Sequence, residues 1–103
     1  MNTETASRAL AALGHEARLD IYRLLVRAGD DGLIVGDIAA LVNLPLSTLA
    51  HHLRTLVEAS LVVQERRGRE VVSRADYATM GETLAFLTAE CCAGITIVRE
   101  QVA

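Results

Sequence analysis

The spacing of apolar residues predicts two helices within the first 29 residues. The first helix ends at Gly14, and we expect one of its early threonines to cap its start. Its apolar face is made of Ala6, Leu10 and Leu13. The second helix begins near Glu16 and ends at Gly29, a residue type that favours helix termination. Its apolar face is made of Ala17, Ile21, Leu24, Leu25 and Ala28.

The next segment has the pattern of a helix-turn-helix. A turn and a short β-prone run over residues 30–35 lead to a compact helix over residues 37–42. Its inward residues are predicted to be Ile38, Leu41 and Val42. Pro45 separates this helix from the next one, because proline disfavours helical backbone at the residue before it. Ser47 is then expected to cap a fourth helix over residues 48–59. Two helices joined by a four-residue break are typical of this motif.

The remaining pattern predicts a hairpin followed by a long helix. Two β-branched runs, residues 61–66 and 71–74, flank a turn at Gly68. The last helix is expected over about residues 76–94, and its apolar positions are Tyr77, Met80, Leu84, Leu87 and Cys91. The order of elements indicates a mainly α fold with a small β hairpin. We interpret it as a winged helix-turn-helix flanked by two outer helices, in a single domain over residues 1–103.

Composition narrows the class of protein. Half of the residues are apolar but only three are aromatic, so the core is expected to be aliphatic. Few aromatic side chains also disfavour a base-stacking surface. No apolar run approaches the roughly 18 residues of a membrane span, and the first residues lack the pattern of a secretory signal. We therefore expect a cytoplasmic protein with no membrane partner.

The charge of the chain is unevenly distributed. The formal net charge is −3, which by itself opposes binding to nucleic acid. Residues 47–74, however, carry five arginines against three glutamates. The segments on either side hold the acidic excess, with four arginines against six acids before and one against four after. The predicted fourth helix and hairpin therefore form the basic part of the chain.

The predicted fourth helix is amphipathic, with a polar arc that suits DNA. Its apolar arc is made of Leu49, Leu53, Leu56 and Val57, with His52 at the edge of the core. The opposite arc carries the candidate DNA-binding residues Ser47, Thr48, His51 and Arg54. The hairpin adds a cluster for backbone phosphates, made of Arg66, Arg67 and Arg69. The ordinary alternative is a solvated surface, but the combination favours binding to double-stranded DNA.

Cys91 and Cys92 are the only cysteines, and they are adjacent. A disulfide between neighbours needs a strained ring, and a reducing compartment opposes it. Packing as a small apolar residue suits Cys91, which continues the apolar stripe. Together, near a helix end expected at Gly94, the two thiols also offer soft ligands to a thiophilic ion. Zinc suits the pair less, because it prefers four ligands. Redox sensing through the same pair stays open.

These residues resemble the ArsR/SmtB family of dimeric metalloregulatory repressors over about residues 6–94. The resemblance rests on ALGHEARLDIYRLL at residues 12–25, on LSTLAHHL at residues 46–53, and on the hairpin. The closing FLTAECC at residues 86–92 is similar to the branch of arsenic-responsive repressors that carries a vicinal cysteine pair at this point.

The resemblance implies a homodimer formed by the first and last helices and bound to palindromic operator DNA. It implies no required cofactor. It also implies that trivalent arsenic, inorganic or organic, binds Cys91 and Cys92 as the inducer and lowers the affinity for DNA.

Two departures from the family pattern bear on the inducer. The founding arsenic repressors carry Cys-Val-Cys before the third helix, where this chain has Ile34, Val35 and Gly36. The branch with the terminal pair often has a third cysteine downstream, and none follows Cys92 here. Trivalent arsenic prefers three sulfur ligands, whereas an organic trivalent arsenical has only two positions to fill. We therefore hypothesise a preference for organoarsenicals.

Three other functions remain as alternatives. The first is a repressor that senses oxidants or persulfides through the same thiols. The second is a winged-helix module that binds protein, with an incidental basic hairpin. The third is an enzyme such as a dithiol reductase, which is the weakest because the cysteines lack the Cys-X-X-Cys spacing. We expect the chain not to be an enzyme.

Overall fold

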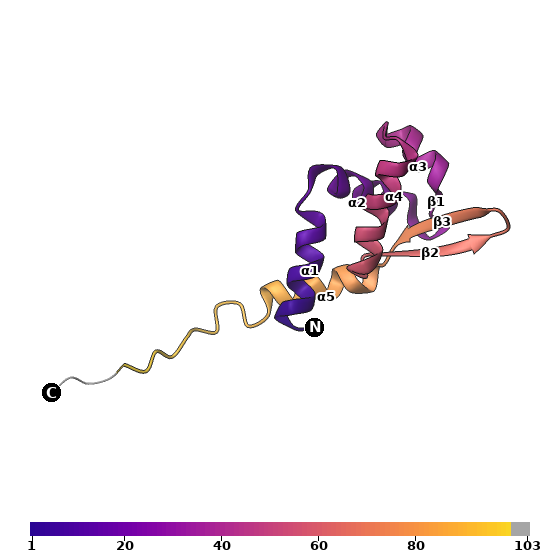
Figure 1. The fold of residues 1–103 in the computed structure, drawn as a ribbon. Coiled ribbons are helices and arrows are strands. Elements are labelled where there is room, and N and C mark those ends of the chain that lie inside the picture. Colours follow the sequence, from indigo (N-terminus) through magenta and orange to yellow (C-terminus); the bar gives the residue numbers. More distant parts are fainter. Residues whose placement is uncertain (100–103) are drawn as a thin grey trace.

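The computed structural model describes residues 1–99 and has the predicted winged helix-turn-helix fold (Figure 1). The helices gather at one end of a small sheet, and the hairpin of that sheet extends away from them (Figure 1). The elements in chain order are α1 (Thr3–Leu13), α2 (Glu16–Ala28), the 3₁₀ turn η1 (Gly29–Asp31), β1 (Leu33–Ile34), α3 (Val35–Val42), α4 (Leu46–Glu58), β2 (Val62–Arg67), β3 (Glu70–Ala75) and α5 (Tyr77–Thr88). Within residues 1–99, no helix is long and apolar enough to cross a membrane.

The sheet is antiparallel and has the strand order β1-β3-β2. The predicted hairpin is confirmed: β2 and β3 pair from Val62 opposite Ala75 to Arg67 opposite Glu70. Its two-residue turn begins at Gly68, whose φ of 62° glycine adopts without the strain that a side chain brings. The short β1 adds to the other side of β3, so the start of α3 is tied to the base of the hairpin.

The core is aliphatic, as the composition predicts. Helices α2 and α4 supply its centre, where Ile21, Leu25, Leu49 and Leu56 are fully buried. The sequence pattern missed Tyr22, which is also buried. In α1 the buried face consists of small residues, namely Ala6, Ala9 and Ala12. Leu10, which was predicted to face inward, is 40% exposed.

Helix starts differ from the predictions by one or two residues. Asn2, not a threonine, caps α1, and its side chain accepts from the Thr5 N–H at 2.8 Å. The prediction that Ser47 caps the fourth helix is wrong, because α4 already begins at Leu46. The Pro45 carbonyl accepts the first helical hydrogen bond, from Leu49 N–H at 3.0 Å. Proline stays outside with extended backbone, and the helix follows it directly.

Helix α3 also differs from its prediction. It begins at Val35, directly after β1, rather than at Asp37. Ile38 is buried and Val42 is half-buried as expected, but Leu41 is 63% exposed. Leu41 lies beside Leu24 and Arg27 at a shallow depression between α2 and α3, where the core no longer reaches.

The prediction that the last helix continues to about residue 94 is wrong. Its start is close to the predicted one, with Asp76 as the cap and Tyr77 as the first residue, but α5 ends at Thr88. The hydroxyl of Thr88 donates back to the Leu84 carbonyl at 3.1 Å, and Ala89 adopts extended backbone. Beyond that point no buried neighbour holds a further turn, so residues 89–99 are exposed and lead away from the folded body (Figure 1). Residues 100–103 belong to the predicted domain but lie outside the described residues.

Candidate nucleic-acid interface and thiol pair

Helix α4 is held by its apolar face and exposes the arc predicted to bind DNA. Leu49, Leu53 and Leu56 anchor it in the core. All four predicted contact residues of the helix are exposed, namely Ser47, Thr48, His51 and Arg54. No side chain caps the start of α4, so the N–H groups of its first turn point out unpaired by the helix. Such donors bind phosphate readily.

Two exposed apolar residues flank this arc on the side of the hairpin, and the sequence pattern does not predict them. Leu46 is 60% exposed, and Ala50, one turn later, is exposed as well. The pattern predicts that the helix starts after Leu46, which places this residue in the turn. The pattern of Ala50 alone carried no signal, because alanine occurs on both faces of helices.

His52 lies behind the exposed arc, at the junction of α2 and α4. It is buried, as its predicted place at the core edge requires, and its Nδ1 has no partner. Its ring centroid is 4.9 Å from that of His15 and 5.8 Å from that of His51. Burial lowers the pKa of His52, and the neighbouring His15, Arg18 and His51 lower it further. His15 itself caps α2, where its Nδ1 accepts from the Ala17 N–H at 3.2 Å.

The hairpin presents its three predicted arginines in different settings. Arg67 pairs with Glu65, and Arg74 lies 3.7 Å from the same carboxylate. These two arginines lower the pKa of Glu65 and are partly neutralised by it. Among residues 1–99, Arg66 and Arg69 form no ion pair. The alternation of side chains along β2 places Arg66 on the opposite sheet face from Arg67.

A groove separates α4 from the hairpin. One hollow of about 300 Å³ is lined by residues that include Ala50, Arg54 and Gln64. A second of about 350 Å³ is lined by residues that include Leu46 and Arg69. Val35 and Val71 line both, so the two hollows adjoin. The walls of the groove are largely apolar; Arg54 and Gln64 line one hollow, and Arg69 and Glu70 line the other.

A separate apolar surface lies on α1 and α5. Leu84 and Leu87 of α5 are 56% and 54% exposed, although both continue the apolar stripe of that helix. Leu10 of α1 and Phe86 of α5 line a shallow hollow of about 500 Å³ between the two helices. Large apolar side chains gathered on one face of a small protein are typical of an interface.

Cys91 and Cys92 lie in the turn that follows α5. Both are free and exposed, and their Sγ atoms are 3.3 Å apart. The turn is built by a hydrogen bond from Cys91 N–H to the Thr88 carbonyl, and by positive φ values of 60° at Glu90 and 65° at Cys92. Cys91 therefore does not pack on the apolar stripe, contrary to the alternative considered for it.

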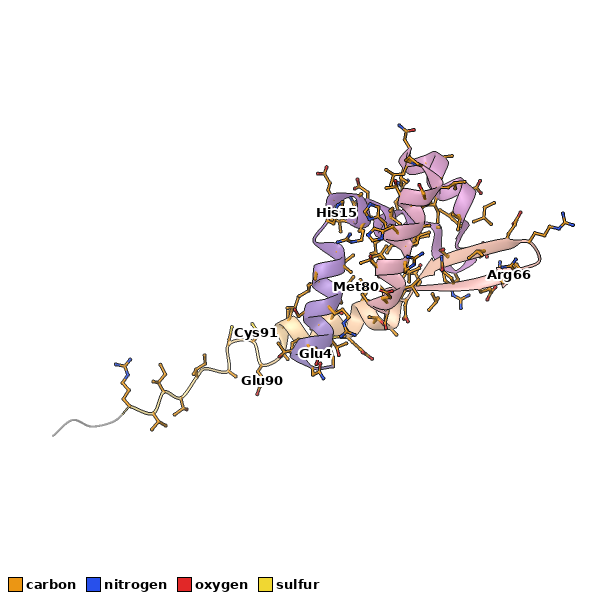
Figure 2. The ribbon with its side chains drawn as sticks, viewed as in Figure 1. Glu4, His15, Arg66, Met80, Glu90 and Cys91 are labelled. Carbon is orange, nitrogen blue, oxygen red and sulfur yellow. The ribbon has the colours of Figure 1, made fainter. Side chains whose placement is uncertain are left out.

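The thiol pair and the hairpin lie at opposite ends of the molecule. Figure 2 shows Cys91 beside Glu90 beyond the end of α5, and Arg66 out on the hairpin. The Sγ separation is well above the about 2.05 Å of a disulfide. In the described part of the chain, no group of three or more His, Cys, Asp or Glu side chains is placed to hold a metal ion. The two sulfurs stand as an accessible pair of soft ligands.

Comparison with known proteins identifies the central segment. The family model described as helix-turn-helix domain matches residues 13–65. These residues include α2, α3 and α4, and end within β2. Among curated proteins, none matches this sequence significantly.

Solved structures extend the likeness to most of the chain. An ArsR-like transcriptional regulator from Rhodococcus sp. RHA1 is 27% identical with a TM-score of 0.72, covering 82% of this chain and 76% of its own. A possible transcriptional regulator for arsenical resistance is also 27% identical, with a TM-score of 0.69 and coverage of 79% and 81%. The homodimeric winged helix-turn-helix domain Mb0332 from Mycobacterium bovis, a possible ArsR-family regulator, shares the fold at 23% identity, with a TM-score of 0.69 and coverage of 86% and 82%.

Proposed function

We propose a specific role for this chain, which belongs to the family of helix-turn-helix domains. Members of that family with this fold are DNA-binding transcriptional regulators and not enzymes. The chain is a repressor of the ArsR type that binds operator DNA as a homodimer. Trivalent arsenic releases it from DNA by binding the thiols of Cys91 and Cys92. The arrangement of α4 carries the first half of this proposal and the 3.3 Å sulfur pair carries the second.

The exposed arc of α4 supports DNA binding. A reading helix must present short polar side chains near its N-terminus and be fixed by its other face. Ser47, Thr48 and His51 meet the first requirement, and the buried leucines of α4 meet the second. Arg66 and Arg69, which have no acidic partner among residues 1–99, are available for phosphates flanking the groove that the helix enters.

The apolar surface of α1 and α5 supports the homodimer. Leu10, Leu84 and Leu87 are each at least 40% exposed, and water would cover them in a monomer. A second copy of the same face buries them symmetrically, as in most homodimers. Two reading helices must then lie about 34 Å apart to enter successive major grooves.

The number of ligands at the pair supports trivalent arsenic over zinc. Trivalent arsenic takes at most three sulfur ligands, whereas zinc in proteins prefers four ligands. The two exposed sulfurs, 3.3 Å apart, supply two ligands. Zinc would need two more, and among residues 1–99 no group of three or more His, Cys, Asp or Glu side chains is placed to hold a metal ion.

The number of sulfurs supports an organic arsenical. The chain has two cysteines, so one subunit offers two sulfur ligands. A monomethylated trivalent arsenical carries two exchangeable oxygens. Each thiol gives its proton to one of these oxygens, which leaves as water, and two As–S bonds form without any change in oxidation state. Inorganic arsenite keeps one oxygen unless a thiol of the other subunit or of glutathione replaces it.

Ligation acts on DNA binding through the dimer. The turn at residues 89–92 follows α5 directly, and α5 is half of the proposed dimer surface. Fixing that turn changes how the two copies meet and hence the spacing of the reading helices. A coupling of about 1–3 kcal/mol gives a useful response.

Titration of an operator complex tests the proposal. A duplex is first selected from random double-stranded DNA, and its complex is followed by fluorescence anisotropy. We expect the logarithm of the affinity to fall steeply with the logarithm of salt concentration, since phosphate contacts release counterions. Failure to bind duplex DNA with that slope would favour a protein-interaction module instead.

The same complex is then titrated in parallel with methylarsenite, arsenite, antimonite, zinc and peroxide. Methylarsenite should release DNA at the lowest concentration. Release by peroxide alone would replace the arsenic assignment by redox sensing, because exposed adjacent thiols are also open to oxidation.

A further inference from the structure

An apolar strip formed by Leu46 and Ala50 flanks the DNA-facing arc of α4, on the side of the hairpin. We propose that this strip reads thymine, by packing against the 5-methyl group in the major groove. The inference rests on the proposed function and adds to it a base preference of the operator. Nothing in the polar residues of the arc requires that preference.

Helical geometry places the two side chains together. They are four residues apart, so they lie one above the other on the same side of α4. Both lie on the side of α4 that faces the hairpin. Leu46 lines one hollow of the groove with Arg69, and Ala50 lines the other with Gln64. The strip begins at the first residue of the helix, the end that contacts base edges when a reading helix enters the major groove.

Exposure makes the strip unusual for its surroundings. Leu46 is 60% exposed, next to the polar Ser47, and it is not needed by the core. In the major groove, the thymine methyl is the apolar group of the four standard bases, and alanine or larger apolar side chains contact it. Contact removes both apolar surfaces from water, which a polar side chain at this position cannot do.

The surroundings of the strip favour DNA over another occupant. Arg54 on α4 and Arg69 on the hairpin line the groove against one carboxylate, Glu70, so cations outnumber anions there and the site favours a polyanion. The apolar surface of α1 and α5 lies away from the N-terminal end of α4 (Figure 1), so a second copy on that surface leaves the strip open.

Deoxyuridine substitution provides the direct test, because it removes only the methyl group. In the selected duplex, each thymine is replaced in turn and the dissociation constant is measured by anisotropy. At one or two positions per half-site, wild-type affinity should fall about fourfold for each methyl lost, the equivalent of about 0.8 kcal/mol. At the other positions it should not change.

Variants assign that loss to the strip. With Leu46→Ala, replacing the sensitive thymine should weaken binding by less than about twofold, because the packing partner is gone. Leu41→Ala is the matched control: it removes another leucine that is more than half exposed, but on α3 beside α2. It should keep the full fourfold sensitivity. Melting temperatures check that both variants fold, as truncation of an exposed side chain should allow.

The outcomes separate this inference from the proposed function. If the protein binds the duplex equally well with thymine and with deoxyuridine at every position, the reading of methyl groups is wrong while repression stands. If Leu46→Ala keeps the sensitivity, another residue makes the contact and the strip is not the reader. If no duplex is selected at all, the proposed function itself fails.

Discussion

The proposed reading helix α4 and the thiol segment, residues 89–99, are stabilised in opposite ways. In α4 three leucines are buried almost completely and hold the helix against α2 and α3. In the thiol segment every residue is exposed, and the described contacts that hold its turn are local: backbone hydrogen bonds and the contact between the two Sγ atoms. The core therefore fixes the position of the proposed reading helix, whereas the sulfurs have only a local geometry that a ligand or a second subunit must complete.

The largest expected difference concerns stability. Leu49→Ala removes a fully buried side chain, and we expect the free energy of unfolding to fall by about 2–5 kcal/mol, since a cavity is left in the core. Ile95→Ala is the control in the thiol segment, where the side chain is 90% exposed, and should change it by less than about 0.5 kcal/mol. Urea unfolding measures both. Equal losses would show that the thiol segment has a core of its own.

A pair of glycines sharpens the same comparison. Gly32 and Gly94 both have positive φ, 64° and 91°. A Cβ at Gly32 would lie 2.5 Å from the Ser73 carbonyl oxygen, whereas a Cβ at Gly94 would meet nothing within 4 Å. Gly32→Ala should cost about 1–3 kcal/mol from the backbone strain alone. Gly94→Ala should leave the midpoint of thermal unfolding nearly unchanged. Residues 89–99 are exposed, so the backbone there can adopt another φ without disturbing the core. A midpoint that falls as far for Gly94→Ala as for Gly32→Ala would contradict this account.

The arginines should differ in their contributions to DNA binding. Arg66→Ala removes a cation with no acidic partner among residues 1–99 from each subunit of the proposed dimer, and it should reduce the slope of log affinity against log salt by about two. Arg67→Ala should reduce it less, because Glu65 already neutralises that guanidinium in part. Arg99→Ala, in the thiol segment, should leave it unchanged. Slopes that respond equally to all three substitutions would mean that overall charge, not the hairpin, governs binding.

The smallest effect is a pH dependence that belongs to the reading helix. Burial holds the pKa of His52 below its ordinary value, with His15, Arg18 and His51 adding to the shift. As the pH falls through about 6.5, the unfolded chain takes up a proton at this site before the folded chain does. The free energy of unfolding should therefore decrease as pH falls through that range. His52→Gln should remove this part of the slope in urea titrations at pH 5 to 7.5, and an unchanged slope would assign it elsewhere.

The fold was predictable because its signals are local and agree with one another. The leucine spacing of α4, the turn at Gly68 and the helix start near Asp76 each appear in the sequence and each is found in the structure. The end of α5 was not predictable in the same way. Its apolar spacing continues to Cys91, but no packing partner stabilises further helical turns after Thr88. A periodic pattern in the sequence does not show whether such a partner exists.

The candidate site was predictable only in its polar part. An amphipathic pattern predicts the polar arc of α4 directly. Its four candidate contact residues are all exposed, namely Ser47, Thr48, His51 and Arg54. The pattern does not predict Leu46, since an apolar residue after proline is ordinarily taken for a turn or core position. The pairing of Arg67 with Glu65 along one face of β2 also depends on side-chain conformation, which residue order does not specify.

The most direct test of the link between the two regions is the operator dissociation constant with and without saturating methylarsenite. It is measured for the wild-type protein and for a Cys91→Ser, Cys92→Ser variant. We predict that the arsenical weakens wild-type binding by about 5- to 150-fold, the range of ordinary allosteric coupling. The variant should bind DNA like the wild type and should not respond to the arsenical. An equal response in both proteins, or none in the wild type, would contradict the claim that the thiol pair controls the reading helix.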